Sequence, residues 1–314
     1  MLTHLIILLD DTCVSYCHYN VPHVDHRLIS LDDLKAGIVW AMKENVNIQF
    51  VYPDYKLPDE YNQAIASIDH TKIKPVKQGQ DADVVVLTDW KVSAVDDLHH
   101  TTCIVHASRN DLSSHLTTLK EILSQVARLN IVLTDVADFT DADIDDYKLL
   151  LSKLSDIVEE QLKLGKNVQM NLLTDRLMLD EMNNCNAGVS NVTLAPDGRF
   201  YLCPAFYYDK SKGHIGGLRQ GLNIKNPQLL QLDHAPICRK CDAWQCRRCV
   251  WLNEQLTLDC NTPSHQQCVM AHLERNASRD LLVRLEEEGF RYGSTHRIEE
   301  MKELDPFNTY KQWK

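Results

Sequence analysis

The most constraining feature of this chain is a concentration of cysteine between residues 185 and 268. Two Cys-x2-Cys pairs, Cys238-Arg-Lys-Cys241 and Cys246-Arg-Arg-Cys249, present thiolates from tight backbone turns. Soft metal ions and iron–sulfur clusters require thiolates in this arrangement. The stretch therefore predicts a metal domain, and its cysteines are Cys185, Cys203, Cys238, Cys241, Cys246, Cys249, Cys260 and Cys268.

Three kinds of cysteine chemistry compete for this stretch. Disulfides form in oxidising compartments, and the start MLTHLIILLDDTC shows neither a basic n-region nor a small-residue cleavage site. Structural zinc would use the two Cys-x2-Cys pairs as one tetrahedral site. However, zinc would leave the other four cysteines unused, and the two pairs are closer together than the usual ribbon spacing. Two cubane clusters, which need up to about eight ligands, use the whole set.

The residues between the cysteines suit the positioning of ligands. Asp197-Gly198 separates Ser190–Pro196 from Arg199–Cys203 and predicts a β-hairpin with Cys203 on the return strand. The paired cysteines enclose basic side chains that would either offset thiolate charge and lower the thiol pKa values or lie solvated at the surface: Arg239, Lys240, Arg247 and Arg248.

This cysteine pattern resembles the SPASM domain of radical-SAM peptide-modifying enzymes. Seven cysteines follow the family order, with Asn-Ala-Gly after Cys185 and Pro196-Asp197-Gly198 before Cys203. Only the spacings before the third and fourth clustered cysteines are shorter than in the family. The resemblance implies a first auxiliary 4Fe-4S cluster on Cys185, Cys203 and Cys249. It implies a second 4Fe-4S cluster on Cys238, Cys241, Cys246 and Cys268. For the fourth ligand of the first cluster it leaves open Cys260 or an unoccupied coordination site.

Composition excludes several classes of protein. With 314 residues, 44% of them hydrophobic and 25% charged, the chain is long enough for two packed domains and is globular rather than disordered. A formal net charge of −11 argues against a nucleic-acid surface. The longest apolar run near the start, Leu5–Leu9, is far short of a membrane span, and no lipidation signal is visible. We expect no nucleic-acid or membrane partner and a cytoplasmic location.

The region before the cysteines alternates strand-like and helix-like stretches, which predicts an α/β fold with a mostly parallel sheet. Helices are predicted from an N-cap at Ser30 to about Glu44, from Asp111 through Ala127, from Thr140 to Gly165, and from Ala271 to about Gly289. Strands are predicted at the apolar runs Leu5–Leu9, Ile48–Tyr52, Val84–Leu87, Ile104–His106, Ile131–Leu133 and Val168–Leu172.

A second motif follows the first predicted strand. Cys13-x3-Cys17-x2-Asn20 resembles the Cys-x3-Cys-x2-Cys motif of the radical-SAM family, with asparagine in place of the third cysteine. In that family the three cysteines hold three irons of a cubane, and the fourth iron chelates S-adenosylmethionine. The family's Gly-Gly-Glu stretch after the second strand is also replaced, here by Tyr52-Pro53-Asp54-Tyr55. We therefore expect a partial (β/α) barrel that has lost its S-adenosylmethionine site.

Other cysteine and histidine groups offer alternatives. A different metal is a second hypothesis for the N-terminal loop, since thiolate and imidazole both suit zinc or iron, with the candidates Cys13, Cys17, His18, His23 and His26. A further group lies on a predicted strand edge, where core or surface histidines are commoner than ligands: His99, His100, Cys103 and His106. No other triad feature supports Cys103 as a nucleophile.

Within the larger group the chain looks most like the CXXX repeat peptide maturases. The closer resemblance is carried by Cys249-Val-Trp-Leu-Asn and Asn261-Thr-Pro-Ser-His-Gln-Gln-Cys268, behind the altered loop at Cys13. It implies a degenerate barrel over 1–180, a SPASM domain with a β-hairpin over 181–275, and a C-terminal helix with a polar tail over 276–314.

The implied function is that of a partner subunit in ribosomal peptide maturation. Such a subunit would bind a cysteine-repeat precursor peptide or relay electrons, in a heterodimer with a radical-SAM maturase that has the intact cysteine motif and alone binds S-adenosylmethionine. A self-sufficient metalloenzyme using Cys13 and Cys17 is one alternative. A structural zinc-binding interaction protein is the other.

Overall fold

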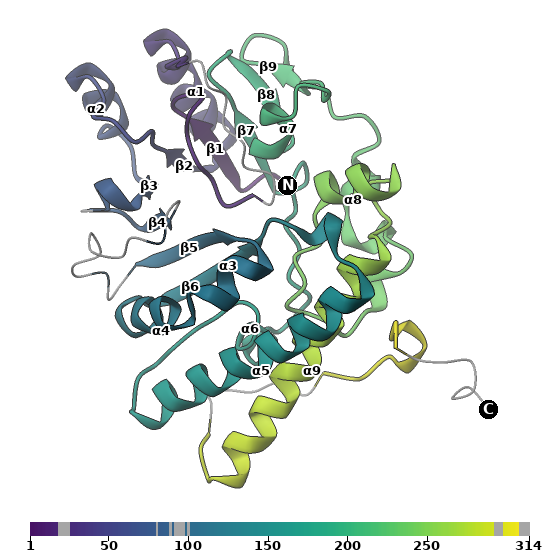
Figure 1. Cartoon of the computed structure of the whole chain (residues 1–314). Helices are drawn as coiled ribbons and strands as arrows, with labels where there is room; N and C mark the ends of the chain where they lie inside the picture. The colour runs from purple at the N-terminus through teal and green to yellow at the C-terminus, as the bar shows by residue number, and fades with distance from the viewer. Residues whose placement is uncertain are drawn as a thin grey trace. The chain divides into compact units, whose positions relative to one another are not determined.

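The computed structural model describes residues 1–17, 26–79, 81–87, 90, 98, 101–291 and 298–307. These residues form an α/β protein, so the fold class predicted from the sequence is confirmed (Figure 1). The chain divides into two compact units. Unit 1 comprises Met1–Ile104 and Asn186–Gln231, and unit 2 comprises Val105–Cys185 and Leu232–Lys314. The predicted domain boundaries near 180 and 275 stay predictions. Within the described ranges, no helix has both the length and the apolar character that a membrane crossing needs.

Unit 1 is built on a sheet with the strand order β10-β9-β8-β7-β1-β2-β3-β4. The central strand β1 runs parallel to β7 on one side and to β2 on the other, with Leu5 opposite Val192 and Ile48. Residues Leu5–Leu9 are fully buried, as expected for a parallel sheet covered on both faces. The parallel strands are β1 (His4–Leu8), β2 (Asn47–Val51), β3 (His70–Pro75), β4 (Val84–Leu87) and β7 (Asn191–Leu194).

The predicted hairpin is present, and it joins β7 to β8 within this sheet. Gly198 has φ +75° in the turn, and the amide of Gly198 donates to the carbonyl of Ala195 at 3.0 Å. Cys203, predicted on the return strand, instead lies just beyond it, as the N-cap of the short helix α7 (Pro204–Tyr208). The antiparallel strands are β8 (Arg199–Tyr201), β9 (Gly216–Gly217) and β10 (Gly221–Leu222).

Two longer helices complete unit 1, α1 (Leu31–Glu44) and α2 (Asp59–Ile65). The helix α1 begins where the sequence predicts, because the Ser30 hydroxyl accepts a hydrogen bond from the Asp33 amide at 3.0 Å. It packs closely on the sheet at Gly37, where a Cβ atom would lie 2.5 Å from Leu194 Cδ2. The helix α2 was not predicted.

Unit 2 is mainly helical. The strand β5 (Thr102–Ala107) begins in unit 1 and ends in unit 2, and β6 (Arg128–Leu133) follows it. The long helix α5 (Asp141–Lys163) and α9 (His265–Glu287) run side by side (Figure 1), joined by a hydrogen bond from Tyr147 Oη to Glu274 Oε1 at 2.7 Å. The other helices are α3 (Arg109–Ser114), α4 (Leu116–Gln125), α6 (Asp175–Met178) and α8 (Val250–Thr257).

Two predicted elements of this unit are corrected. The helix expected over Asp111–Ala127 is two helices, α3 and α4, because His115 between them has non-helical backbone angles. The strand expected at Val168–Leu172 is reduced to an isolated bridge between Leu129 and Met170. There the Asn171 side-chain amide, instead of a backbone ladder, bonds the amide and carbonyl of Ile131, at 2.8 Å each.

The C-terminal helix begins earlier than predicted. Ser264 and Gln267 form a capping box, so α9 starts at His265 rather than at Ala271. As a result Cys268 lies within the first turns of a helix rather than in the loop that precedes it. Among the described residues the remaining helical pieces are short 3-10 turns: η1 (Val76–Gln78), η3 (Val136–Asp138), η4 (Pro227–Leu230), η5 (Leu232–His234), η6 (Cys238–Lys240) and η7 (Lys302–Leu304).

Candidate metal centre

One cavity in unit 2 is lined by the thiols of Cys238, Cys241, Cys246 and Cys268. The first three come from a loop of tight turns, in which the Cys241 amide donates to the Cys238 carbonyl and the Cys246 amide to the Ala243 carbonyl, each at 3.0 Å. The fourth comes from the start of α9. The loop and the helix thus bring together the four cysteines that the family resemblance implies for one cluster.

Burial opposes the ionisation of all four thiols, and neighbouring thiols add to this in three of them. Burial raises the pKa of Cys241 to about 11 and the pKa of Cys268 to about 12, and the neighbouring thiols add to both increases. Burial also raises the pKa of Cys238 and Cys246, and in Cys246 the other three thiols contribute. Four thiolates can therefore coexist in this cavity only when a bound cation balances their charge.

The basic residues between the paired cysteines divide between the two predicted alternatives. Arg248 favours the thiolate of Cys238, but burial outweighs it, so the pKa of Cys238 is raised rather than lowered. Arg248 is itself buried and donates to Asn261 Oδ1 at 2.5 Å and to the Cys260 carbonyl at 3.3 Å. Arg239 and Lys240 are exposed, and Arg247 is half-buried. Arg248 is therefore part of the wall of the cavity rather than a solvated surface residue.

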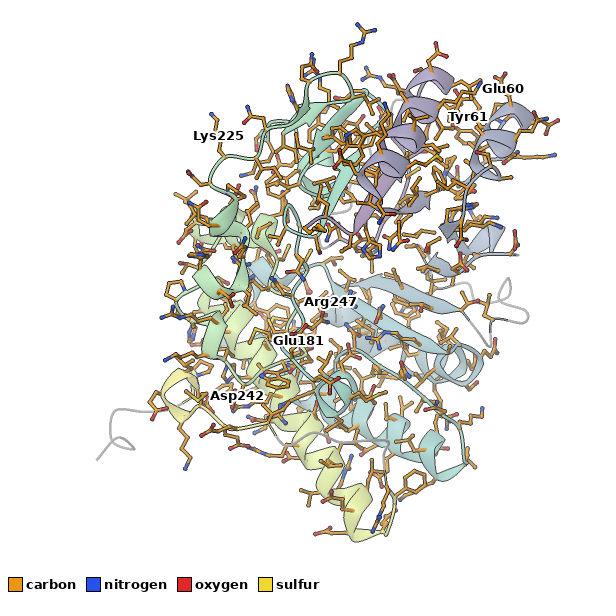
Figure 2. All side chains as sticks on the ribbon, turned by 180° about the vertical axis from the view of Figure 1, so that it is seen from behind. Glu60, Tyr61, Glu181, Lys225, Asp242 and Arg247 are labelled. Atoms are coloured by element: carbon orange, nitrogen blue, oxygen red, sulfur yellow. The ribbon has the colours of Figure 1, made fainter. Side chains whose placement is uncertain are left out.

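A histidine that sequence reasoning missed belongs to the same cavity. The Nε2 atom of His272 lies 3.4 Å from the Cys241 sulfur, and burial lowers the pKa of His272 to about 4, which leaves the imidazole neutral. Potential ligand atoms of Cys241, Asp242 and His272 lie within 4.8 Å of one another. Asp242, labelled in Figure 2, is engaged elsewhere, because both its oxygens accept from Arg275, at 2.8 and 2.9 Å.

The cysteines implied for the first cluster belong to different units. Cys185, Cys249 and Cys260 are in unit 2, whereas Cys203 is in unit 1. Cys249 is buried as the N-cap of α8, and Cys185 and Cys260 are partly exposed. In unit 1 the buried Cys203 hydrogen-bonds the side chain of Cys17, which lowers the pKa of Cys17. The ligand set of this cluster stays a prediction.

The first cysteine of the N-terminal loop is buried and hydrogen-bonded. Cys13 is fully buried, its sulfur donates to the Val51 carbonyl at 3.0 Å, and burial raises its pKa. The Tyr208 hydroxyl donates to the Cys13 carbonyl. His18, Asn20 and His23 of this loop lie outside the described residues.

Tyrosine hydroxyls donate hydrogen bonds to two buried carboxylates beside this loop. The Tyr55 hydroxyl donates to Asp10 at 2.8 Å, and the Tyr207 hydroxyl donates to Asp11. Both carboxylates are buried. His26 Nδ1 lies 3.6 Å from the same Asp10. The described residues at the start of this loop therefore make internal hydrogen bonds.

The cysteine and histidine group predicted on a strand edge forms no second metal site among the residues that the structure describes. Cys103 is buried in β5, and burial raises its pKa to about 12, so it stays a thiol at neutral pH. His106 is half-buried in the same strand, and His99 and His100 lie outside the described residues.

Comparisons with known proteins place the fold. No protein-family model matches the chain, and no curated protein matches it. Among solved structures, native anSMEcpe with bound AdoMet and Cp18Cys peptide is 13% identical, with coverage of 92% of this chain and 100% of that chain and a TM-score of 0.61. A histidine-tagged form of anSMEcpe with bound AdoMet is also 13% identical, with coverage of 91% and 99% and a TM-score of 0.60. Streptococcus suis SuiB bound to precursor peptide SuiA is 12% identical, with coverage of 70% and 63% and a TM-score of 0.43.

At this level of identity the likeness concerns the fold. The chain has the same overall fold as anSMEcpe, whose structure holds AdoMet and a peptide.

Proposed function

We propose that this chain is a cluster-carrying subunit of a radical-SAM system that matures ribosomally made peptides. The observation that carries the proposal is the convergence of four cysteine thiols on one cavity of unit 2. The fold of a radical-SAM/SPASM enzyme supports the same class of function.

The donor set of the four-thiol cavity suits a 4Fe-4S cluster. The donor set is Cys238, Cys241, Cys246 and Cys268, which is the all-thiolate ligation that such clusters use. The wall between these thiols includes apolar side chains, among them Met182 and Leu304. The buried guanidinium groups of Arg248 and Arg275 favour the thiolate forms of Cys238 and Cys241, respectively. A bound cluster would supply one-electron transfer, and this chain's part is to hold and shield it.

A second 4Fe-4S cluster on Cys185, Cys203 and Cys249 is part of the proposal, and the SPASM-like cysteine order supports it. Cys260 remains one candidate for its fourth ligand. The side chain of Cys17, which hydrogen-bonds Cys203, is a further sulfur beside Cys203 in unit 1.

We also propose that S-adenosylmethionine is bound by a partner chain. The Cys13 thiol donates to the Val51 carbonyl, tyrosine hydroxyls bind Asp10 and Asp11, and asparagine stands at position 20 in place of a cysteine. These features support a barrel that keeps the fold and has lost the radical chemistry. The partner is then a radical-SAM maturase with an intact cysteine motif. The substrate is a cysteine-repeat precursor peptide, which rests on the resemblance to CXXX repeat peptide maturases, and the complex is cytoplasmic.

Two other functions are each favoured by one observation. An all-cysteine donor set is also typical of structural zinc, and the four cysteines of this cavity would then make the chain a structural interaction protein. A hydrogen bond with Cys203 lowers the pKa of the Cys17 thiol, and a thiol that ionises more readily would suit a self-sufficient metalloenzyme that uses Cys13 and Cys17.

Anaerobic reconstitution followed by metal analysis separates these functions. We expect about eight irons per chain, a brown protein and negligible zinc, as two four-iron cubanes require. Stoichiometric zinc with negligible iron would overturn the cluster proposal. The loaded protein is then incubated with S-adenosylmethionine and a strong reductant, with and without the co-expressed maturase. We expect 5′-deoxyadenosine only when the maturase is present, and its formation by this chain alone would establish the self-sufficient enzyme instead.

A further inference from the structure

We propose that His272 is a positioning residue that donates a hydrogen bond to the Cys241 sulfur and raises the reduction potential of a cluster held by the four-thiol cavity. The inference rests on the proposed function, because it concerns a cluster at that site. It assigns a role to a residue outside the cysteine pattern.

The placement of His272 follows from helix geometry. It lies four residues after Cys268 on α9, so the two side chains share one face of the helix and both line the cavity. The imidazole is 2% exposed, and its Nε2 atom lies 3.4 Å from the Cys241 sulfur, within the range of a hydrogen bond to sulfur. One turn of α9 therefore supplies one ligand and contacts a second.

The chemistry of a cluster ligand fixes the direction of this hydrogen bond. A thiolate bound to iron carries no proton, so the Cys241 sulfur can only accept, and Nε2 must carry the hydrogen. The other ring nitrogen, Nδ1, has no hydrogen-bond partner among the described residues and lies 3.9 Å from Asp305. The imidazole thus has one close polar contact within the described part of the chain, and that contact is the sulfur.

The charged groups around His272 are paired with one another. Arg275, on the next turn of α9, donates to Asp242 at 2.8 and 2.9 Å and to Asp305 at 2.6 Å. Asp242 also accepts from the Met301 amide at 3.1 Å. Because Asp242 is fully engaged, Cys241, Asp242 and His272 do not form a mononuclear metal site, although their ligand atoms lie close together.

A hydrogen bond to a ligand sulfur withdraws negative charge from the cluster. The reduced cluster carries one more electron than the oxidised cluster, so the donor stabilises the reduced form more and raises the potential. Removing the donor should therefore make the cluster harder to reduce, without removing a ligand.

The test compares reduction potentials, measured by potentiometric EPR titration of the reconstituted full chain. His272→Leu removes the donor, His272→Gln restores an N–H of similar reach, and His265→Leu, at the exposed first residue of the same helix, is the matched control. We expect His272→Leu to keep the full iron content and to move one titration wave to a more negative potential. His272→Gln should recover part of this shift, and His265→Leu should show none. The wave of the other cluster should stay in place in all three variants.

A second measurement needs no substitution. In wild-type protein grown with isotopically labelled histidine, ENDOR of the reduced cluster should show one weak nitrogen coupling, as expected across a hydrogen bond to sulfur. No coupling, or no difference in potential between wild type and His272→Leu, would overturn the proposal. So would a strong coupling together with loss of iron in His272→Leu, because histidine would then be a ligand. Absence of iron from the wild-type protein would overturn the proposed function as well, and iron analysis distinguishes that case.

Discussion

The cysteine sulfur atoms of the two units have different surroundings. In unit 2, four thiols face one cavity. In unit 1, the Cys13 sulfur donates to the Val51 carbonyl, and the Cys17 side chain hydrogen-bonds Cys203. Proximity of cysteines therefore does not by itself define a metal site. What distinguishes unit 2 is that four of its cysteines line one cavity.

The largest difference between the two regions should appear in iron content. Cys241→Ala or Cys246→Ala removes a ligand of the proposed cluster, so each should lose about half of the iron and destabilise unit 2, because cluster binding and folding are coupled there. Cys13→Ala, which changes a buried thiol of unit 1, should keep the iron. Metal analysis after anaerobic reconstitution measures all three. Full iron retention in both unit 2 variants would show that the ligand assignment is wrong. Iron loss in Cys13→Ala would contradict the predicted difference between the two units.

Glu274, a buried carboxyl group of unit 2, should make the stability of the protein depend on pH. Burial raises the pKa of Glu274 from 4.5 to about 7, and the Tyr147 hydroxyl donates to it at 2.7 Å. Because the folded pKa lies above the unfolded value, the contribution of this group is fully present below pH 4.5 and is lost as the pH rises through about 7. The loss amounts to about 3 kcal/mol.

The matched variant for this prediction is Glu274→Gln, which cannot ionise. Denaturant unfolding at several pH values should show a smaller decline in the variant than in the wild type between about pH 5 and about pH 8, a range chosen to span the shifted region. Parallel declines would mean that Glu274 does not titrate in this range.

In unit 1 the tyrosines should matter for stability and not for iron. Tyr207→Phe leaves the buried Asp11 carboxylate without the hydroxyl that donates to it, which should cost about 2 kcal/mol. Tyr201→Phe is the control, because the Tyr201 hydroxyl donates to Asp197 at 2.8 Å and Asp197 is less buried than Asp11. The cost of this substitution should be about 1 kcal/mol. Unfolding curves and iron analysis test both points, and a changed iron content in Tyr207→Phe would contradict the comparison.

The smallest effect should come from two helix caps, one in each unit. Ser30→Ala at α1 and Ser264→Ala at α9 should each lower the free energy of unfolding by about 1 kcal/mol. Because Ser264 anchors the turn that carries Cys268, only Ser264→Ala should speed the loss of iron to a chelator. Equal rates of iron loss in the two variants would argue against the role of this turn.

Much of the fold could be predicted from local patterns. The buried strands β1, β2 and β4 appear as apolar runs, Ser30 and Thr140 mark helix starts, and Asp197-Gly198 marks the hairpin. The prediction failed where a side chain replaced backbone pairing, as Asn171 does opposite Ile131. It also failed where one residue interrupted a helical pattern, as His115 does between α3 and α4.

The candidate site could be predicted only in part. Cysteine spacing together with the family resemblance placed Cys238, Cys241, Cys246 and Cys268 in one group, and these four line one cavity. His272 was missed, although its spacing of four residues from Cys268 becomes informative once both are known to lie on one helix. The contact of Tyr208 with Cys13 spans 195 residues of sequence and has no local signal.

The helix α9 has a consequence for the lifetime of the protein. Its first turns carry Cys268 and His272, and its last turns are tied to α5 by ion pairs such as Arg284 with Asp156 at 2.8 Å. Over 23 residues it is about 34 Å long. A bound cofactor would add an anchor to the first turns, so we expect trypsin to cleave the cofactor-free protein at Arg275 and Arg279 more readily than the loaded protein. The supply of cofactor would then determine how long newly made copies escape degradation.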